Sequence, residues 1–149
     1  MIGVPVPWVF VLAYLCGVAI DLAFPLRPPL EAMTAVKLFG GVLFIAGALV
    51  AGWGWMMFWK ARTTRVPGKE SSSLVTGGPY RFMRNPMYVG LTLAYLGEAG
   101  MLTQIWPLLF LPLVLVYLNR VVIPLEERKL KEVFGTSYDD YRRRVHRWI

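Results

Sequence analysis

Four long apolar runs dominate this chain, and they constrain its fold more than any other feature. They cover residues 4–24, 36–59, 86–102 and 105–123. A helix needs about 20 apolar residues to cross a bilayer, and in lipid only helices and closed barrels satisfy their own backbone polar groups. The chain is 56% hydrophobic and 17% charged, whereas soluble domains are about 25% charged. The sequence therefore predicts an all-α integral membrane protein, with about four transmembrane helices in one domain over residues 1–149.

Local signals mark the ends and the contacts of these helices. Asn85 followed by Pro86 is typical of a helix start, with an N-cap and a proline in the first turn. Asp21, near the end of the first span, is expected to reach interfacial water, and a contact inside the bundle is the alternative. The second span carries two small-xxx-small pairs, which allow close packing in lipid. They are Gly47 with Ala51 and Ala48 with Gly52.

Two short amphipathic helices are predicted after the fourth span, where Pro124 marks the exit from the membrane. The first covers residues 126–134 and is expected to end at Gly135. Ser137 and Asp140 resemble a capping box for the second. The arginines that follow suit an anionic membrane surface. They are Arg142, Arg143, Arg144 and Arg147.

Lysine and arginine are distributed unevenly between the connecting segments. Residues 60–85 hold six of them and residues 120–149 hold eight, whereas residues 25–37 hold two. Because cytoplasmic segments carry the excess of basic residues, both basic segments and both termini are expected to face the cytoplasm. The net charge of +7 is explained in this way, and no basic and aromatic module predicts a nucleic-acid partner.

The single cysteine and the single histidine limit the available chemistry. Cys16 excludes an intrachain disulfide and a cysteine-cluster metal site, and it is expected to be a small buried hydrophobic residue. His146 alone supports neither a Ser-His-Asp triad nor a histidine-based metal site. We therefore expect no metal. The sequence also contains no strand-borne G-x-G-x-x-G and no P-loop.

The segment between the two apolar halves, residues 74–90, reads Leu-Val-Thr-Gly-Gly-Pro-Tyr-Arg-Phe-Met-Arg-Asn-Pro-Met-Tyr-Val-Gly. Gly77 and Gly78 let the backbone approach a ligand closely. Arg81 and Arg84 place two positive charges before a helix start, an arrangement that suits a carboxylate or a phosphate. The alternative is a membrane-surface loop whose arginines only fix the topology.

Two adjacent carboxylates, Glu126 and Glu127, follow the fourth span directly. Such a pair needs water or partners. It either stabilises a helix N-terminus through the helix dipole or recognises a cation or ribose hydroxyls. A ligand with a carboxylate, an amine and a sugar would match arginines, glutamates and backbone amides together, and S-adenosylmethionine is such a ligand.

A second motif, residues 126–145, reads Glu-Glu-Arg-Lys-Leu-Lys-Glu-Val-Phe-Gly-Thr-Ser-Tyr-Asp-Asp-Tyr-Arg-Arg-Arg-Val. In this order and spacing, the two motifs resemble the isoprenylcysteine carboxyl methyltransferase family of integral membrane enzymes. That family is distantly similar to the phospholipid N-methyltransferases. The resemblance covers residues 60–149, and the first two spans match only in kind.

The resemblance implies S-adenosylmethionine as the cofactor and S-adenosylhomocysteine as the product, in a site built from residues 72–90 and 120–141. The expected cofactor-binding residues, including Arg84 from the charge argument, are Leu74, Val75, Tyr80, Arg84, Asn85, Pro86, Met87, Tyr88 and Glu126. Arg120 lies near the position of a substrate-facing arginine in the family. Glu127 is the candidate general base if the acceptor is an amine.

The chain departs from the family pattern at four positions. Asn85 replaces the commoner histidine, and Ser72 stands where eukaryotic members have another histidine. Val122 stands about where those members have the substrate-facing arginine, and His146 replaces the usual proline. These changes leave the cofactor expectation intact and concern the acceptor.

The predicted function is S-adenosylmethionine-dependent methylation of a lipophilic or lipid-modified acceptor at the cytoplasmic membrane face, as in isoprenylcysteine carboxyl O-methylation. The alternatives are a phospholipid or lipid-amine N-methyltransferase, an NADPH-dependent sterol-type reductase and a non-enzymatic scaffold. Membrane lipids are expected partners, and no obligate protein partner is evident. Gly90, Gly97 and Gly100 of the third span either admit a lipid tail or pack against the second span.

Overall fold

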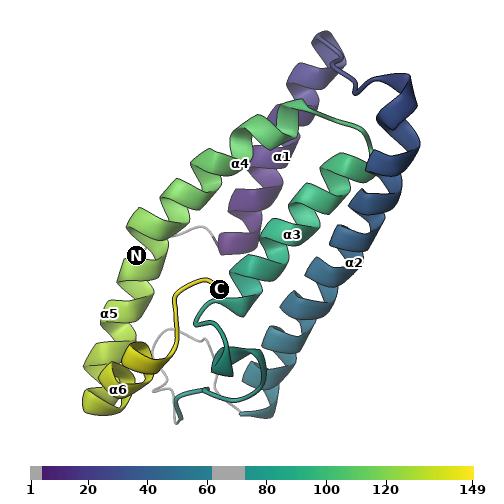
Figure 1. The fold of residues 1–149 in the computed structure, drawn as a ribbon. Coiled ribbons are helices and arrows are strands. Elements are labelled where there is room, and N and C mark those ends of the chain that lie inside the picture. The colour runs from purple at the N-terminus through teal and green to yellow at the C-terminus, as the bar shows by residue number, and fades with distance from the viewer. Residues whose placement is uncertain (1–4, 62–72) are drawn as a thin grey trace.

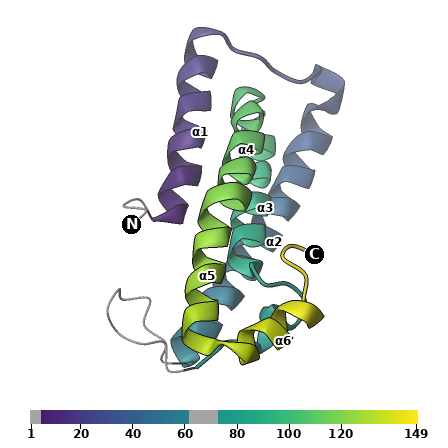
Figure 2. The same cartoon turned by 90° about the vertical axis from the view of Figure 1, so that its left-hand side faces the viewer.

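The computed structural model describes residues 5–61 and 73–149, and its long helices lie side by side in a bundle (Figure 1). They are α1 (Val6–Ala23), α2 (Leu30–Lys60), α3 (Pro86–Met101) and α4 (Trp106–Tyr117). A 3₁₀ turn, η1 (Gly78–Arg81), precedes α3. A π-helical turn, η2 (Leu118–Val122), joins α4 to α5 (Ile123–Phe134). The last helix, α6 (Thr136–Arg144), lies across the end of the bundle at which α5 ends (Figure 2).

Three helical stretches within the described ranges are long and apolar enough to cross a membrane. They are Val6–Ala23, Leu30–Lys60 and Trp106–Phe134. The predicted all-α membrane fold is therefore confirmed. α3 has only 16 residues, fewer than the roughly 20 that a bilayer requires, so a fourth full span is not established. Of the basic segment over residues 60–85, which was expected to be a polar loop, residues 62–72 lie outside the described residues.

Two prolines affect the helix boundaries in ways that the sequence did not reveal. Pro29 is the N-cap of α2, so this helix begins at Leu30 and takes up residues expected to connect the first two spans. Pro124 does not end the fourth helix. Because proline has no N–H, a regular turn there would leave a carbonyl without its donor. The chain instead widens into η2, where the Ile123 N–H bonds to the Leu118 carbonyl five residues back, and the helical path continues into α5.

Glycines bring α2 and α3 into direct backbone contact. The buried residues of α2 recur at every seventh position and are Gly40, Gly47 and Gly54. A Cβ on Gly90 would lie 2.5 Å from the Ala51 nitrogen, so a larger residue requires a backbone shift. The predicted pair of Gly47 and Ala51 therefore packs against α3. The pair of Ala48 and Gly52 faces outward instead.

The same packing decides between the two predicted roles of the third-span glycines. A Cβ on Gly100 would lie 3.1 Å from Gly40 Cα, and a Cβ on Gly97 would collide with the Phe44 backbone. Because α2 covers this face of α3, the glycines serve close helix packing. The prediction that a lipid tail enters beside them is wrong.

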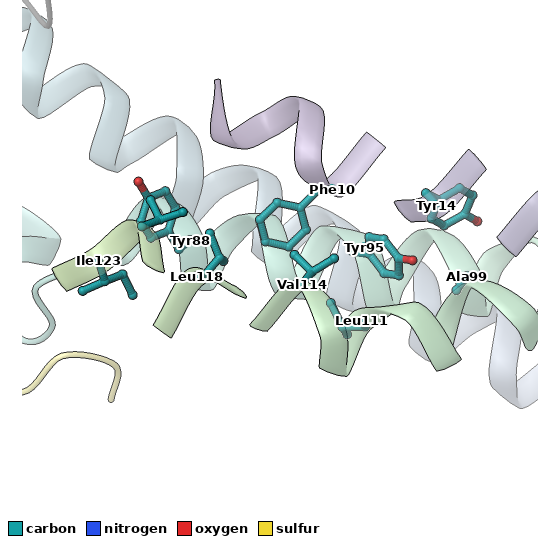
Figure 3. Packing of buried hydrophobic residues seen from close by; sticks show 10 residues of the cluster. Phe10, Tyr14, Tyr88, Tyr95, Ala99, Leu111, Val114, Leu118 and Ile123 are labelled. Atoms are coloured by element: carbon teal, nitrogen blue, oxygen red, sulfur yellow. The ribbon is translucent and has the colours of Figure 1, made fainter. Parts of the chain in front are cut away.

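Aromatic residues fill the space between α1, α3 and α4 (Figure 3). Tyr95 packs edge-on against Phe10 and Tyr14, with ring centroids 6.2 and 5.0 Å apart. Its hydroxyl donates a hydrogen bond to the Pro107 carbonyl at 2.7 Å, which satisfies a polar group that would otherwise be costly to bury. The cluster continues to the fully buried Ile123, so α5 is anchored to the same core.

Two residues of α1 correct the sequence expectations. The Asp21 side chain is 2% exposed and accepts a hydrogen bond from Arg27 Nη1 at 2.6 Å, so it contacts protein rather than open water. A buried carboxylate needs such a partner. Cys16 was expected to be buried, but it is exposed. The face of α1 that packs inward consists of Phe10, Tyr14, Gly17 and Asp21.

The turn between α5 and α6 is made by Gly135, which ends α5 as predicted and has a φ of +51°. That conformation favours glycine because a side chain would be strained there. The predicted capping box is wrong, since α6 begins at Thr136 and shows no side-chain cap hydrogen bond. Ser137 therefore lies inside the helix.

Candidate active site

The two sequence motifs meet at one end of the bundle, opposite the α1–α2 and α3–α4 connections (Figures 1 and 2). They surround a pocket of about 720 Å³, its open mouth included. The predicted site residues that line it are Leu74, Val75, Tyr80, Arg84, Asn85, Met87, Tyr88, Glu126 and Glu127. Pro86 is fully buried, and Arg120 lines a different hollow. Ser72 lies outside the described residues.

The backbone before α3 is shaped by a glycine and a proline. Gly78 has a φ of +58°, which favours glycine, and Pro86 occupies the first turn of α3 as predicted. Asn85 is the N-cap residue, but it makes no side-chain cap hydrogen bond. Its Nδ2 donates instead to the Arg147 carbonyl at 3.0 Å. The predicted start of the helix is therefore confirmed, whereas the predicted capping hydrogen bond of the Asn85 side chain is not formed.

Tyr88 and Glu126 connect α3 to α5 inside the pocket. The Tyr88 hydroxyl donates a hydrogen bond to Glu126 Oε1 at 2.7 Å, and Tyr88 is 3% exposed. A carboxylate offers about four lone-pair sites, and this bond uses one of them. Glu126 therefore has acceptor capacity for an amine or for hydroxyl groups.

Glu127 is held by two arginines. Its Oε1 accepts a hydrogen bond from Arg84 Nη1 at 2.7 Å, and Arg147 binds both carboxylate oxygens at 3.1 and 2.8 Å. The side chains of Glu127 and Arg84 are only 13% and 12% exposed. Both oxygens of Glu127 are therefore already bound by guanidinium groups, whereas the predicted role as a general base requires an oxygen that contacts the acceptor. Arg147 was expected at the membrane surface, and the structure places its guanidinium group against Glu127, which lines the pocket.

Two tyrosines of α6, Tyr138 and Tyr141, also line the pocket. The Tyr141 hydroxyl donates a hydrogen bond to the Tyr80 carbonyl at 2.7 Å, and Tyr138 accepts one from Arg84 Nη1 at 3.3 Å. Burial raises the pKa of Tyr141 to about 12, and burial together with Glu127 raises the pKa of Tyr138. Both rings are therefore neutral near pH 7.

Sequence reasoning missed an apolar wall of the pocket. It consists of Phe58, Leu130 and Phe134. The Phe58 ring packs edge-on against Tyr80 with centroids 5.3 Å apart. The amphipathic pattern of residues 126–134 predicts one apolar face made of Leu130, Val133 and Phe134. The pattern does not reveal that Leu130 and Phe134 line a pocket while Val133 is exposed. Within the described part of the chain, no cluster of His, Cys, Asp and Glu residues could hold a metal ion.

A second hollow, the α3–α4 groove, lies on the other side of the first α3 turn. Its volume is about 1180 Å³, its open mouth included. The groove is lined by Val89, Thr92, Leu93, Leu115, Val116, Asn119, Arg120, Trp148 and Ile149. Its wall is mostly apolar, with one cation. Tyr88 lines the pocket while its neighbour Val89 lines the groove, so the two hollows lie on different sides of α3.

Comparison with known proteins gives a family. The family model described as phospholipid methyltransferase matches residues 36–137, which is more than half of the chain. A probable protein-S-isoprenylcysteine O-methyltransferase of Oryza sativa subsp. indica is 30% identical over 81% of this chain and 64% of its own length. No solved structure matches.

Two further relatives match over shorter stretches. The protein-S-isoprenylcysteine O-methyltransferase of Schizosaccharomyces pombe is 39% identical over 48% of this chain and 30% of its own length. Methanethiol S-methyltransferase 1 of Bradyrhizobium diazoefficiens is 35% identical over 56% of this chain and 29% of its own length. The chain thus spans less than two thirds of these curated relatives. The isoprenylcysteine methyltransferase names of two of them agree with the resemblance found in the two motifs. The chain belongs to the phospholipid methyltransferase family.

Proposed function

We propose that the pocket binds S-adenosylmethionine and that the chain catalyses transfer of its methyl group to a lipophilic acceptor. The observation that carries the proposal is the charge arrangement of the pocket, with Glu126 on α5 and Arg84 before α3. A ligand that bears an amine, sugar hydroxyls and a carboxylate suits this arrangement. Family membership and the methyltransferase names of the relatives support it.

The polar groups of the pocket fit this cofactor. Arg84 Nε is buried, and it has no hydrogen-bond partner within the described residues. A buried donor without a partner costs about 1–3 kcal/mol, and a ligand carboxylate would satisfy it. Glu126 would hold the amine or the ribose hydroxyls, and Phe58, Leu130 and Phe134 would contact the purine ring.

The protein would then contribute to the reaction by binding the cofactor and the acceptor and by aligning them. When bound, S-adenosylmethionine supplies a methyl group on a sulfonium centre. Alignment of two reactants contributes up to roughly 7–11 kcal/mol. A carboxylate acceptor is ionised near pH 7 and needs no general base. Because two arginines bind Glu127, we assign it to holding Arg84 in place rather than to proton transfer.

The α3–α4 groove is the proposed acceptor site. Its apolar wall suits a hydrocarbon chain, and Arg120 suits an anionic head group. The same charge disfavours a cationic lipid amine, so carboxyl O-methylation is preferred to phospholipid N-methylation. Glu126 and Glu127 in the pocket likewise disfavour the phosphates of NADPH, which argues against the reductase alternative.

The pocket end of the bundle is the proposed cytoplasmic end, with both termini on that side. Most basic residues of the chain lie in the segments around it, and such residues are retained in the cytoplasm. A charged, water-soluble cofactor would then enter from the cytoplasm. The acceptor would enter the groove from the membrane.

The test is methyl transfer from cofactor labelled in its methyl group, with N-acetyl-S-farnesylcysteine, phosphatidylethanolamine and methanethiol as alternative acceptors. Mild base releases methanol from a methyl ester but not from a methylated amine or sulfide. We expect base-labile label on the farnesylcysteine. Base-stable label on the phospholipid or on the thiol would mean that the acceptor is an amine or a thiol rather than a carboxylate. Absence of label on all three would contradict the proposed function.

A further inference from the structure

Arg147 lies between the cofactor pocket and the α3–α4 groove. Its Nε and Nη2 bind the two carboxylate oxygens of Glu127 at 3.1 and 2.8 Å. Its Nη1 donates a hydrogen bond to Asn119 Oδ1 at 2.9 Å. Glu127 lines the pocket and Asn119 lines the groove. One guanidinium group therefore contacts a wall of each hollow.

The backbone around Arg147 is fixed at the start of α3. The Arg147 carbonyl accepts a hydrogen bond from Asn85 Nδ2 at 3.0 Å, and the His146 carbonyl accepts one from the Arg84 N–H at 2.8 Å. The segment after α6 runs back toward α3 in this way (Figure 1). The Arg147 side chain is 32% exposed, whereas Arg143 of the same basic run is 80% exposed.

These contacts have a consequence for each hollow. On the pocket side, Glu127 Oε1 also binds Arg84, so Arg147 helps to set where Arg84 stands. On the groove side, the contact with Asn119 Oδ1 fixes the orientation of the amide. With its oxygen engaged, Asn119 has its NH₂ group left as the donor for the groove, next to Arg120.

We infer that Arg147 is a positioning residue that orients Glu127 for the cofactor and Asn119 for the acceptor. The inference rests on the proposed function. Arginine is required because its planar fork bonds two partners at once. A lysine has a single ammonium group, so it can retain the ion pair with Glu127 while losing the bond to Asn119.

The test compares Arg147→Met, Arg147→Lys, Asn119→Ala, the double variant Arg147→Lys with Asn119→Ala, and the exposed control Arg143→Met. Thermal unfolding first checks that each variant is folded. Calorimetry then measures the affinity of each variant for S-adenosylhomocysteine and for N-acetyl-S-farnesylcysteine. We expect Arg147→Met to weaken both ligands by about tenfold, as loss of charge-assisted bonds implies. Arg147→Lys should weaken only the binding of N-acetyl-S-farnesylcysteine, by the same factor as Asn119→Ala. The double variant of Arg147→Lys and Asn119→Ala should bind it no more weakly than either single variant. Arg143→Met should change neither affinity.

A second readout does not depend on either ligand. Amide hydrogen exchange at Arg84 should accelerate in Arg147→Met and stay unchanged in Arg143→Met, because the Arg84 N–H is held by the segment that Arg147 anchors. Wild-type affinities and exchange in Arg147→Met would overturn the inference, as would multiplicative losses in the Arg147→Lys, Asn119→Ala double variant. If Arg147→Met does not fold, the lysine and alanine variants decide. Absence of S-adenosylhomocysteine binding in the wild type would instead overturn the proposed function together with the inference.

Discussion

The Tyr88 hydroxyl donates a hydrogen bond to Glu126 Oε1 at 2.7 Å, although the two residues lie 38 positions apart. Tyr88 belongs to the motif before and within α3, and Glu126 belongs to the motif that continues through α5. The bond joins the two motifs at one pocket. The ion pair between Arg84 and Glu127 at 2.7 Å is a second link between the motifs. The hydrogen bond from the Tyr141 hydroxyl to the Tyr80 carbonyl at 2.7 Å is a third.

Replacing Glu126 should weaken cofactor binding more than replacing its partner. Glu126→Gln removes the proposed charged contact to the cofactor, and a hydrogen bond to a charged group contributes about 1.5–3 kcal/mol. Tyr88→Phe removes only the group that orients Glu126, so its effect should be smaller. The measurement is S-adenosylhomocysteine affinity by calorimetry, with Glu132→Gln on the exposed side of α5 as the control. Wild-type affinity in a folded Glu126→Gln variant would remove this residue from the site.

The contact of α2 with α3 should tolerate no side chain at Gly90. A Cβ there would lie 2.5 Å from the Ala51 nitrogen, whereas a Cβ on Gly52 would point into open space. Gly90→Ala should destabilise the protein by about 1–3 kcal/mol, as expected of overpacking. Gly52→Ala should leave the thermal midpoint unchanged or slightly higher. Equal midpoints for the two variants would mean that the helices are not in this contact.

Much of the site could be predicted from the sequence because its residues lie in two compact motifs. Asn85 and Pro86 mark a helix start through local chemistry, and the acid pair that includes Glu126 follows an apolar run directly. The role of Arg147 could not be predicted in this way. Its partner Glu127 lies 20 positions away, and a basic run next to a membrane span has the same composition whether it faces lipid or a carboxylate.

The fold, too, could be predicted from the sequence only in part. The apolar runs predicted the helices, since burial in lipid depends on length and composition. They did not predict that Asp21 would bind Arg27, because that contact depends on how the chain turns after α1. The absence of an N–H in Pro124 can be read from the sequence, but the sequence does not show whether the helix ends there or widens into η2.

Alkaline pH should destabilise the α6 contact with η1. Burial raises the pKa of Tyr141 to about 12, above its unfolded value of about 10. This contribution to stability is therefore complete below about pH 10 and is lost as the pH rises toward 12. Tyr141→Phe should lower stability at pH 7 by about 1 kcal/mol, through loss of the bond to the Tyr80 carbonyl. It should also flatten the alkaline decline, and thermal midpoints from pH 7 to 12 measure both effects. An identical decline in the variant would contradict this assignment.

The orientation in the membrane can be read by cysteine labelling in a Cys16→Ala background. Arg143→Cys, at an exposed position of α6, should react with an impermeant thiol reagent only after the cells are opened. Leu26→Cys, in the α1–α2 connection, should react in intact cells. The reverse pattern would place the pocket outside the cytoplasm.

The central claim is that the pocket binds S-adenosylmethionine, and calorimetric titration of the purified protein in detergent tests it most directly. S-adenosylmethionine, S-adenosylhomocysteine and NADPH are titrated separately into the wild type and into Glu126→Gln. The proposed site predicts saturable binding of the first two ligands, weaker binding of both in the variant, and no binding of NADPH. Binding of NADPH alone, or wild-type affinities in Glu126→Gln, would contradict the claim.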